Sequence, residues 1–270
     1  MNSIPNNRCQ FEVFYQPLVC LSTGQIKGFE ALLRWQHPKK GCIAPHDFIP
    51  MAEDTGLIIP LGNWVLKSAM SQMCCWQKIY SDQLEYAKIA VNVSSKQLLH
   101  TNLVQQTEQM LLETGLNPGC LKLEITESLL IENFDRAIFI LEQLSQLGIE
   151  LSIDDFGTGY SSLGRLQTLP IDSLKIDRCF VAQMNESAKK IEIVKAIASL
   201  AHSLKIEIVV EGIETVTQLA IVRDLNCHEG QGYYFAKPLN AKSVAALLNK
   251  GLHWRHHFVN LNGRTLNIDH

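Results

Sequence analysis

The sequence has no dense run of basic residues and no large excess of one charge. Its 24 Lys and Arg residues and 27 Asp and Glu residues give a formal net charge of -3 at pH 7. Nucleic-acid-binding proteins usually carry a basic stripe with interleaved aromatic side chains, and no such stripe occurs here. The composition therefore argues against a nucleic acid polymer as a partner.

Long apolar runs and a secretion signal are also missing. No stretch approaches the roughly 18 to 20 consecutive apolar residues that a membrane-spanning helix needs. Residues 1–8 are polar and do not follow the basic-then-apolar pattern of a signal peptide. We therefore expect a cytoplasmic protein with no membrane contact from this chain.

The cysteines lack the C-x-x-C spacing of a metal or redox motif, and most of them lie in apolar stretches. This pattern argues against a disulfide framework and against zinc, and it predicts reduced thiols, most of them in the core. The eight residues are Cys9, Cys20, Cys42, Cys74, Cys75, Cys120, Cys179 and Cys227.

The chain does have 46% hydrophobic residues over 270 positions, which is enough for one large core. Short apolar runs, predicted to be strands, occur at 11–15, 26–29, 89–93, 121–125, 149–153, 173–176 and 206–210. Helical periodicity marks 63–80 and 187–204. Continuous apolar strands indicate a parallel sheet covered on both faces, and repeated βα units over this length favour an α/β fold of the (βα)₈, TIM-like barrel type.

No linker, repeat or low-complexity tract divides this pattern, so we predict one barrel domain at 11–250 after a lead-in at 1–10. Residues 251–270 form a C-terminal extension. Its Asn262-Gly263 pair is a strong hairpin signal, so a small β-hairpin is predicted there. His253, His256 and His257 could bind a metal, but without other ligands in view a solvated tail is the preferred interpretation.

Two adjacent aspartates, Asp154 and Asp155, follow the apolar run that ends at Ile153. Adjacent carboxylates repel each other, so a fold that presents both at one strand end favours a nearby cation or a strong set of donors. Where the chain turns, both side chains can lean toward one site, and Gly157 permits a tight turn. For this pair alone, a helix cap plus a turn aspartate remains an equal alternative.

Other polar residues also lie in or next to predicted strands. In a parallel barrel, chemistry gathers where the strands end at their carboxyl side. Each residue alone has an ordinary explanation as a cap, a solvated edge or a surface charge, but their number favours one shared site. They are Gln16, Glu30, Asn92, Glu124, Asp154, Asp155, Lys175, Asp177, Glu211 and Gln231.

In their order along the chain, these residues lie in motifs that resemble those of the EAL-domain phosphodiesterases, which hydrolyse cyclic di-GMP. The resemblance extends from Gln16 to Pro238. The motifs are Glu30-Ala31-Leu32-Leu33-Arg34-Trp35, Asn92-Val93-Ser94, Glu124-Ile125-Thr126-Glu127, Asp154-Asp155-Phe156-Gly157-Thr158-Gly159, Lys175-Ile176-Asp177, Glu211-Gly212-Ile213-Glu214 and Gln231-Gly232-Tyr233.

The resemblance implies a role for each matching residue. Glu30, Asn92, Glu124 and Asp154 resemble the ligands of one divalent ion, and Asp154, Asp155 and Glu211 resemble those of a second. Lys175 resembles the residue that orients or deprotonates the attacking water. Gln16, Arg34, Asp177, Glu214 and Gln231 resemble the contacts to the dinucleotide, and Glu127 resembles the residue that holds the loop after Asp155. The resemblance further implies a first strand antiparallel to the rest, and a homodimer.

The expected function is hydrolysis of cyclic di-GMP to linear pGpG by two-metal activation of water. Oxygen ligands suit Mg²⁺ or Mn²⁺, whereas Ca²⁺ is expected to inhibit. Lys175 acts either as a cation beside the phosphate or as a neutral base, and the sequence leaves both open. One alternative is a silent receptor that binds cyclic di-GMP and acts through its dimer surface, and a sensory or cyclase domain outside this chain is a further potential partner.

A third class is a barrel enzyme that acts on a sugar phosphate, or on a glycoside through Glu30 and Glu124 as an acid and base pair. Such a glycosidase has little use for Asn92, the two aspartates and Lys175 around one centre. The phosphodiesterase is therefore the preferred interpretation.

Overall fold

The computed structural model describes residues 10–100, 102–127, 134–158, 163–182, 184 and 188–250. The predicted hairpin and the three histidines of residues 251–270 lie outside the described residues, so both remain predictions.

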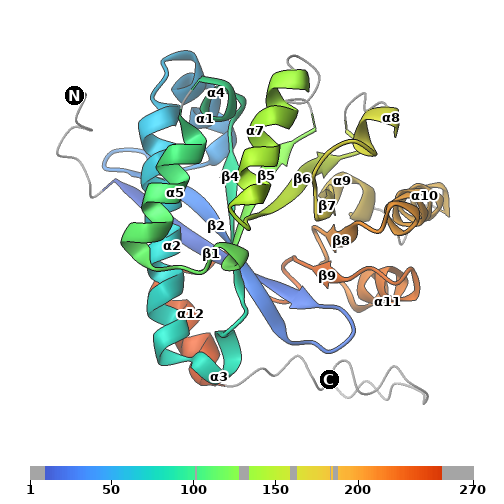
Figure 1. The fold of residues 1–270 in the computed structure, drawn as a ribbon. Helices are drawn as coiled ribbons and strands as arrows, with labels where there is room; N and C mark the ends of the chain where they lie inside the picture. The colour runs from blue at the N-terminus through green and yellow to red at the C-terminus, as the bar shows by residue number, and fades with distance from the viewer. Residues whose placement is uncertain are drawn as a thin grey trace.

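Eight strands close into a barrel (Figure 1). Around the ring their order is β1-β9-β8-β7-β6-β5-β4-β2, and a β1–β2 pairing closes it. The bounds are β1 (Phe11–Cys20), β2 (Ile26–His37), β4 (Lys88–Val93), β5 (Leu121–Thr126), β6 (Glu150–Phe156), β7 (Ser173–Ile176), β8 (Glu207–Val210) and β9 (Glu229–Gly230). A short strand, β3 (Gly41–Ile43), pairs with the far end of β2 outside the ring.

The first strand is the exception to the parallel arrangement. β1 is antiparallel to both of its neighbours, β2 and β9, while the remaining neighbours in the ring are parallel. This geometry confirms the predicted α/β barrel with its reversed first strand. Because β1 and β2 form a hairpin, they need no crossover helix between them.

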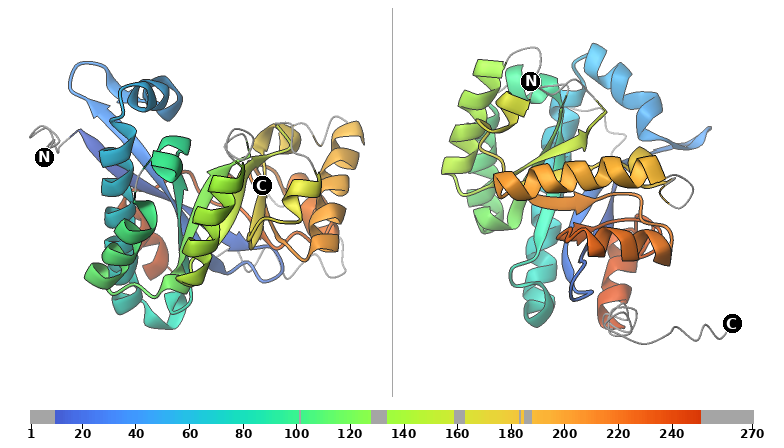
Figure 2. Two further views of the ribbon diagram at one scale, coloured as in Figure 1. Left: turned by 45° about the horizontal axis from the view of Figure 1, so that its top comes forward. Right: turned by 90° about the vertical axis from the view of Figure 1, so that its right-hand side faces the viewer.

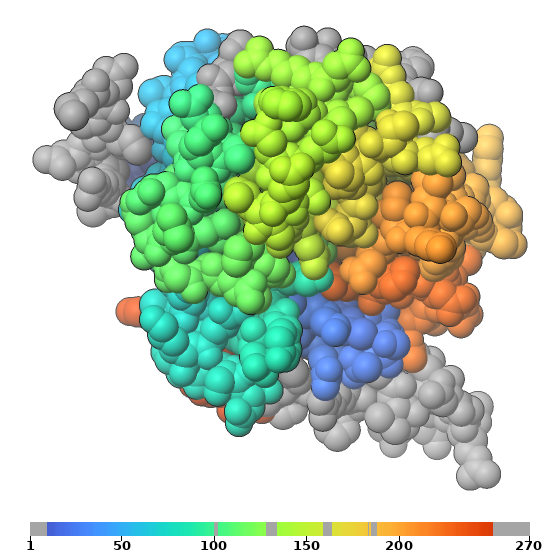
Figure 3. Space-filling view, in the orientation of Figure 1, coloured from blue at the N-terminus to red at the C-terminus, as the bar shows by residue number. Residues whose placement is uncertain are grey.

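Helices surround the barrel (Figure 2). They are α1 (Pro45–Asp54), α2 (Ile58–Ile79), α3 (Ser81–Leu84), α4 (Ser95–His100), α5 (Leu103–Thr114), the 3₁₀ turn η1 (Pro118–Cys120), α7 (Phe134–Gln146), α8 (Leu163–Leu166), α9 (Arg178–Val181), α10 (Ala188–Leu204), α11 (Val216–Asp224) and α12 (Ala241–Asn249). In the space-filling view, α5 and α7 cover one face side by side (Figure 3). No helix in the described part of the chain combines the length and apolarity needed to cross a bilayer.

The main hydrophobic core lies between the strands and the helices. Val65, Ala69, Met73 and Trp76 recur at helical spacing along α2 and are buried, so they form the apolar stripe that faces the sheet. The Trp76 ring lies 5.1 Å from the ring of Phe29 on β2, centroid to centroid. Burying a side chain of this size contributes about 1.5 to 3 kcal/mol, so this layer fixes the strands on which the polar residues stand.

Three sequence expectations need correction. Residues 16 and 30 lie within β1 and β2 and do not end them, because the two strands continue as a long antiparallel ladder. The eighth strand, β9, was missed, since its two residues carry no apolar run. Among the described cysteines all are free, but only Cys74, Cys120 and Cys227 are buried, so the expectation that most are core thiols was wrong.

Candidate metal centre

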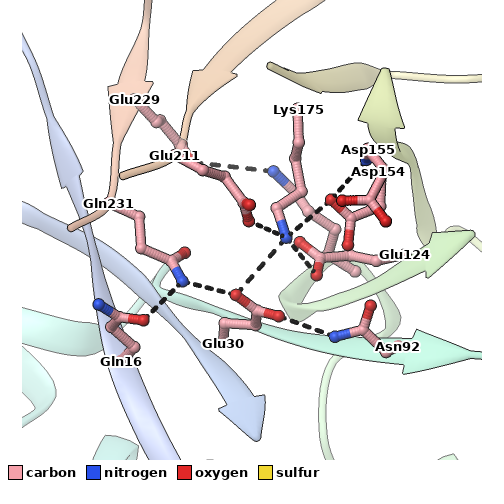
Figure 4. Close-up of polar contacts among 11 residues, drawn as sticks. Gln16, Glu30, Asn92, Glu124, Asp154, Asp155, Lys175, Glu211, Glu229 and Gln231 are labelled. Carbon is pink, nitrogen blue, oxygen red and sulfur yellow. Dashed lines mark hydrogen bonds and ion pairs between the residues drawn. The ribbon is translucent and has the colours of Figure 1, made fainter. Parts of the chain in front are cut away.

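Strand register brings the predicted site residues to one level of the barrel. Gln16 on β1 lies opposite Glu30 on β2, and Asn92 on β4 lies opposite Glu124 on β5. Alternate residues of a strand face the same side, so these four side chains enter the same end of the barrel (Figure 4). That end holds the carboxyl ends of the parallel strands.

A local irregularity in β6 turns both aspartates toward the site. The pairing with β7 shifts register between Ile153 and Phe156, and Asp155 has a left-handed φ of 54°. In a regular strand, adjacent side chains would point to opposite faces. The strand also continues to Phe156, so a bulge inside the strand, rather than the predicted strand end, explains how both carboxylates face one site.

Two acidic groups in the described chain offer oxygen atoms close enough to hold metal ions. One carboxylate oxygen each from Glu30, Glu124 and Asp154 lie within 4.8 Å of one another, and so do oxygens from Asp154, Asp155 and Glu211. The groups share Asp154. A shared carboxylate between two oxygen-rich sets is the arrangement that a pair of hard divalent cations requires.

The ammonium of Lys175 lies at the centre of these carboxylates (Figure 4). Lys175 is fully buried on β7. Its Nζ lies 2.7 Å from Glu211 Oε1, 2.8 Å from Glu124 Oε2, 3.3 Å from Asp154 Oδ1 and 3.5 Å from Glu30 Oε2. One positive charge therefore faces four carboxylates, which leaves an excess of negative charge for divalent cations to neutralise.

The electrostatics of the cluster follow from burial and crowding. Burial raises the pKa of Glu211 to about 7, with Asp154 adding to the shift and Lys175 opposing it. Burial and the charge of Asp154 raise the pKa of Asp155 to about 6. Burial raises the pKa of Glu124 well above its usual value, although Lys175 attracts its carboxylate. Without bound cations, protons therefore compensate part of the negative charge near neutral pH.

Lys175 itself is held in its charged form. Burial alone would lower the pKa of this ammonium, but the surrounding carboxylates outweigh burial and hold the pKa well above its usual range. The neutral base that the sequence left open would therefore need bound metal ions to lower this pKa.

Amide side chains orient Glu30. Asn92 Nδ2 donates to Glu30 Oε1 at 2.7 Å, and Gln231 Nε2 donates to Glu30 Oε2 at 2.6 Å and to Gln16 Oε1 at 3.0 Å. Gln16 Nε2 donates in turn to the Ala236 carbonyl. These bonds link β1, β2, β4 and the segment after β9, so Glu30 is held from both sides. The carbonyl oxygen of Asn92 is the atom that could join a metal ligand set.

Glu127 lies behind the cluster. Its backbone N–H donates to the carbonyl of Asp154, and its carboxylate accepts a 2.9 Å hydrogen bond from the Gly157 N–H. Gly157 has a φ of 94°, a conformation that glycine adopts without steric cost. The contact therefore ties the end of β5 to the start of the loop after Asp155, of which residues 159–162 lie outside the described residues.

A cleft of about 450 Å³ opens above the acidic cluster. Arg34, Asp177 and Glu214 line it, together with Gln16, Glu30, Asp154, Asp155, Glu211 and Gln231. The structure thus brings every predicted dinucleotide contact to one cleft. In the described chain Arg34 has no carboxylate partner; it donates to its neighbouring Leu33 carbonyl and lies over the Phe14 ring.

Sequence reasoning gave no role to two exposed residues of this cleft, Arg178 and Tyr233. Tyr233 closes the motif Gln231-Gly232-Tyr233, and Arg178 directly follows the motif Lys175-Ile176-Asp177. Proximity in sequence to residues with an expected role was therefore the signal that could have identified them.

The donor set fits hard divalent cations. The buried oxygens come from carboxylates, cysteine and histidine are absent from both groups, and a cation of the protein already contacts four of the carboxylates. Fold and site together define a TIM-like barrel with an acidic cluster able to hold metal ions at the carboxyl end of its strands.

Comparison with known proteins identifies the family within this class of barrels. The sequence matches the EAL domain family over residues 2–238, and the chain belongs to that family. It is 43% identical over 239 residues to the bifunctional diguanylate cyclase/cyclic di-GMP phosphodiesterase MucR of Pseudomonas aeruginosa, covering 88% of this chain and 34% of that protein. It is 38% identical over 232 residues to the cyclic di-GMP phosphodiesterase PdeR of Escherichia coli, covering 86% of this chain and 34% of that protein.

The chain thus spans about a third of the length of these curated relatives. Among solved structures, the PaMucR phosphodiesterase in complex with c-di-GMP aligns with a TM-score of 0.84 and 43% identity, over 88% of this chain and 95% of that chain. The EAL enzyme Bd1971 bound to cAMP and cyclic-di-GMP aligns with a TM-score of 0.86 and 36% identity, over 90% of this chain and 65% of that chain.

Proposed function

We propose that this chain hydrolyses cyclic di-GMP to linear pGpG in a metal-dependent reaction. The observation that carries the proposal is the pair of acidic groups that share Asp154 around the Lys175 ammonium, at the floor of a cleft. The names of the relatives and of the PaMucR complex support the choice of substrate.

Glu30, Asn92, Glu124 and Asp154 would hold one Mg²⁺ or Mn²⁺ ion, and Asp154, Asp155 and Glu211 would hold the second. When bound, such ions acidify water and neutralise the charge of the phosphodiester. Ca²⁺ accepts longer and less regular coordination, so we expect it to occupy the site and inhibit.

The side chains of the protein stabilise the developing charge and position the proposed metal ligands. The reaction forms a bond from the water oxygen to phosphorus and breaks one ester bond of the ring, and the leaving oxygen ends as a hydroxyl group. Lys175, as a cation, stabilises the charge that develops on the phosphoryl oxygens. Gln231 and Asn92 keep Glu30 in place, and Glu127 fixes the start of the loop after Asp155.

Substrate recognition is assigned to the cleft walls. The guanidinium of Arg34 suits a phosphate or a guanine edge, and Asp177 and Glu214 can accept hydrogen bonds from guanine N–H groups. Gln231 Oε1 is buried without a hydrogen-bond partner among the described residues, which makes it a further acceptor for a base. With Gln16, these residues form the proposed dinucleotide site.

The test is to incubate the purified chain with cyclic di-GMP and Mg²⁺ or Mn²⁺, and to separate the nucleotides by chromatography. We expect pGpG to accumulate, and EDTA to stop its formation until metal is restored. Tight binding of cyclic di-GMP without any pGpG after overnight incubation would instead support the receptor alternative. Activity that persists in EDTA would rule out the assigned ligand set.

The homodimer and the cytoplasmic location are proposed with the function. Sedimentation of the chain at several concentrations tests the first. A sensory or cyclase domain joined to this chain is proposed from the longer relatives.

A further inference from the structure

The barrel has a second layer of inward-facing residues beneath the acidic cluster. On each parallel strand, the residue two positions before a site residue faces the same side of the sheet. Lys122 therefore lies below Glu124, Ser152 below Asp154, and Ser173 below Lys175. We call this lower level, together with Glu150 and Glu229, the lower lumen.

The interior residues near this level are partly apolar and partly polar. Leu18, Ala90 and Val209, on β1, β4 and β8, form a small buried cluster of their own, separate from the main core. Lys122, Ser152 and Ser173 stand on β5, β6 and β7, the strands between β4 and β8. Ser152 lies opposite Ser173, and Lys122 lies opposite Glu150.

The polar part contains buried atoms without hydrogen-bond partners. Lys122 is 1% exposed, and the two serines are 0% exposed. Lys122 Nζ, Ser152 Oγ, Ser173 Oγ and Glu150 Oε2 make no hydrogen bond to any described residue. Native proteins satisfy nearly all such groups, because an unpaired buried donor or acceptor loses its hydration without compensation. A cluster of four on neighbouring strands therefore points to a ligand.

The ion pairs of Lys122 are longer than hydrogen bonds. Its Nζ lies 3.8 Å from Glu150 Oε2 and 3.8 Å from Glu229 Oε2, beyond hydrogen-bonding distance. The ammonium and the carboxylates therefore keep hydrogen-bonding capacity that a small molecule beside the pairs can satisfy.

The chemistry of the lining selects the ligand. The two carboxylates disfavour an anion, and the ammonium disfavours a second cation. A small neutral molecule that both donates and accepts hydrogen bonds fits the ammonium, the carboxylates and the serine hydroxyls together. We infer that the lower lumen binds a cluster of ordered water molecules that bridges Lys122, Ser152, Ser173, Glu150 and Glu229.

The exposures indicate where this water enters. The exposed fraction of the side chains rises from 1% at Lys122 to 8% at Glu229 and 23% at Glu150. Glu150 is paired with Lys88, and Lys88 and Glu229 line a cleft of about 1000 Å³ at the amino ends of the parallel strands. The cluster therefore exchanges with solvent through the end of the barrel opposite the acidic cluster. This inference does not depend on the reaction proposed above.

A high-resolution crystal structure of the whole chain gives the first test. We expect water density within hydrogen-bonding distance of Lys122 Nζ, Ser152 Oγ and Ser173 Oγ. A closed lumen in which these atoms contact only protein atoms would overturn the inference.

Denaturation of serine variants gives a second, independent test. If water bridges the hydroxyls, Ser152→Ala and Ser173→Ala remove a hydrogen bond and lower the denaturation midpoint. If the lumen is dry, the same changes delete an unsatisfied group and raise the midpoint. Thr107→Val is the matched control, because Thr107 is also 0% exposed and its Oγ1 lacks a partner, but it lies on α5 outside the lumen. We expect Thr107→Val to raise the midpoint.

Discussion

Glu124 and Lys175 form a fully buried ion pair, with 2.8 Å between Glu124 Oε2 and Lys175 Nζ. They stand on β5 and β7, on either side of β6, which carries Asp154. The ammonium thus takes part of the charge compensation that divalent cations would provide. The Lys175 ammonium and added cations should therefore compete for the same carboxylates. Either should be able to replace the other in stabilising the barrel.

Replacing this lysine tests that competition. In Lys175→Met, four carboxylates lose their central cation, so the metal-free protein should lose about 3 to 5 kcal/mol of stability. Added Mn²⁺ should raise the melting temperature more in the variant than in the original chain, while turnover is lost. Thermal denaturation with and without Mn²⁺ measures both effects. An equal shift in the two proteins would contradict the competition.

Removing one proposed ligand should abolish the reaction with little change in fold. Glu30→Gln keeps the shape of the side chain but removes a carboxylate from the shared cluster, so turnover should fall by more than about 100-fold. Glu113→Gln is the control, because Glu113 lies on the surface of α5, paired with Lys67 far from the cleft. Initial rates of pGpG formation compare the two. Substantial activity in Glu30→Gln would remove Glu30 from the ligand set.

The bulge at Asp155 predicts a conflict between stability and binding. Asp155→Gly relieves the left-handed backbone and the repulsion from Asp154, so the metal-free protein should gain about 1 kcal/mol. The same change removes a ligand, so cation affinity should fall at least about 10-fold. Lys205→Gly is a matched control, since Lys205 has a φ of 59° at the end of α10. It should stabilise the protein without changing cation affinity, as urea denaturation and calorimetry can measure.

Cation binding should depend on pH. The raised pKa values of Asp155, about 6, and Glu211, about 7, mean that the folded metal-free protein binds more protons than the unfolded chain between about pH 4 and 7. Its free energy of unfolding should therefore fall as the pH rises through this range. Cations displace these protons, so their affinity should rise over the same range and level off above it.

Calorimetric titrations in two buffers of different ionisation enthalpy would detect the released protons. Asp155→Asn should release fewer of them near pH 6. A cation affinity that is constant from about pH 5.5 to 7.5 would contradict the assignment.

Glu127 should affect turnover more than stability. Glu127→Ala removes the acceptor of the Gly157 N–H, which leaves the loop start unanchored, so turnover should fall about 10- to 100-fold. Glu127→Gln keeps an acceptor oxygen and should recover much of the lost rate. Steady-state kinetics of both variants test this, and equal losses in the two would mean that the charge, rather than the hydrogen bond, is required.

The sequence predicted the central strands well. The runs at 121–125 and 173–176 match β5 and β7 within one residue, because buried parallel strands are continuous apolar segments. The sequence did not predict β9, because its pairing with β1 and β8, rather than its composition, defines it as a strand. The length of β1 and β2 was also underestimated, since an antiparallel ladder beyond the barrel is a tertiary feature.

The site could be predicted only in part. Residue types identified Glu30, Glu124 and Asp154 as candidates, and the family resemblance gave them roles. The sequence could not place the Lys175 ammonium within contact of four carboxylates, because that depends on the register of β2, β5, β6, β7 and β8. Nor could it reveal the bulge at Asp155, since aspartate is compatible with several backbone conformations.

The reversed first strand sets where other protein modules can attach. Because β1 runs against its neighbours, it begins at the carboxyl end of the parallel strands, on the side of the cleft lined by Arg34 and Gln231, whereas α12 lies toward the opposite end (Figure 1). A module joined directly before β1 would sit beside this cleft. A module joined directly after α12 would start from the other end of the barrel.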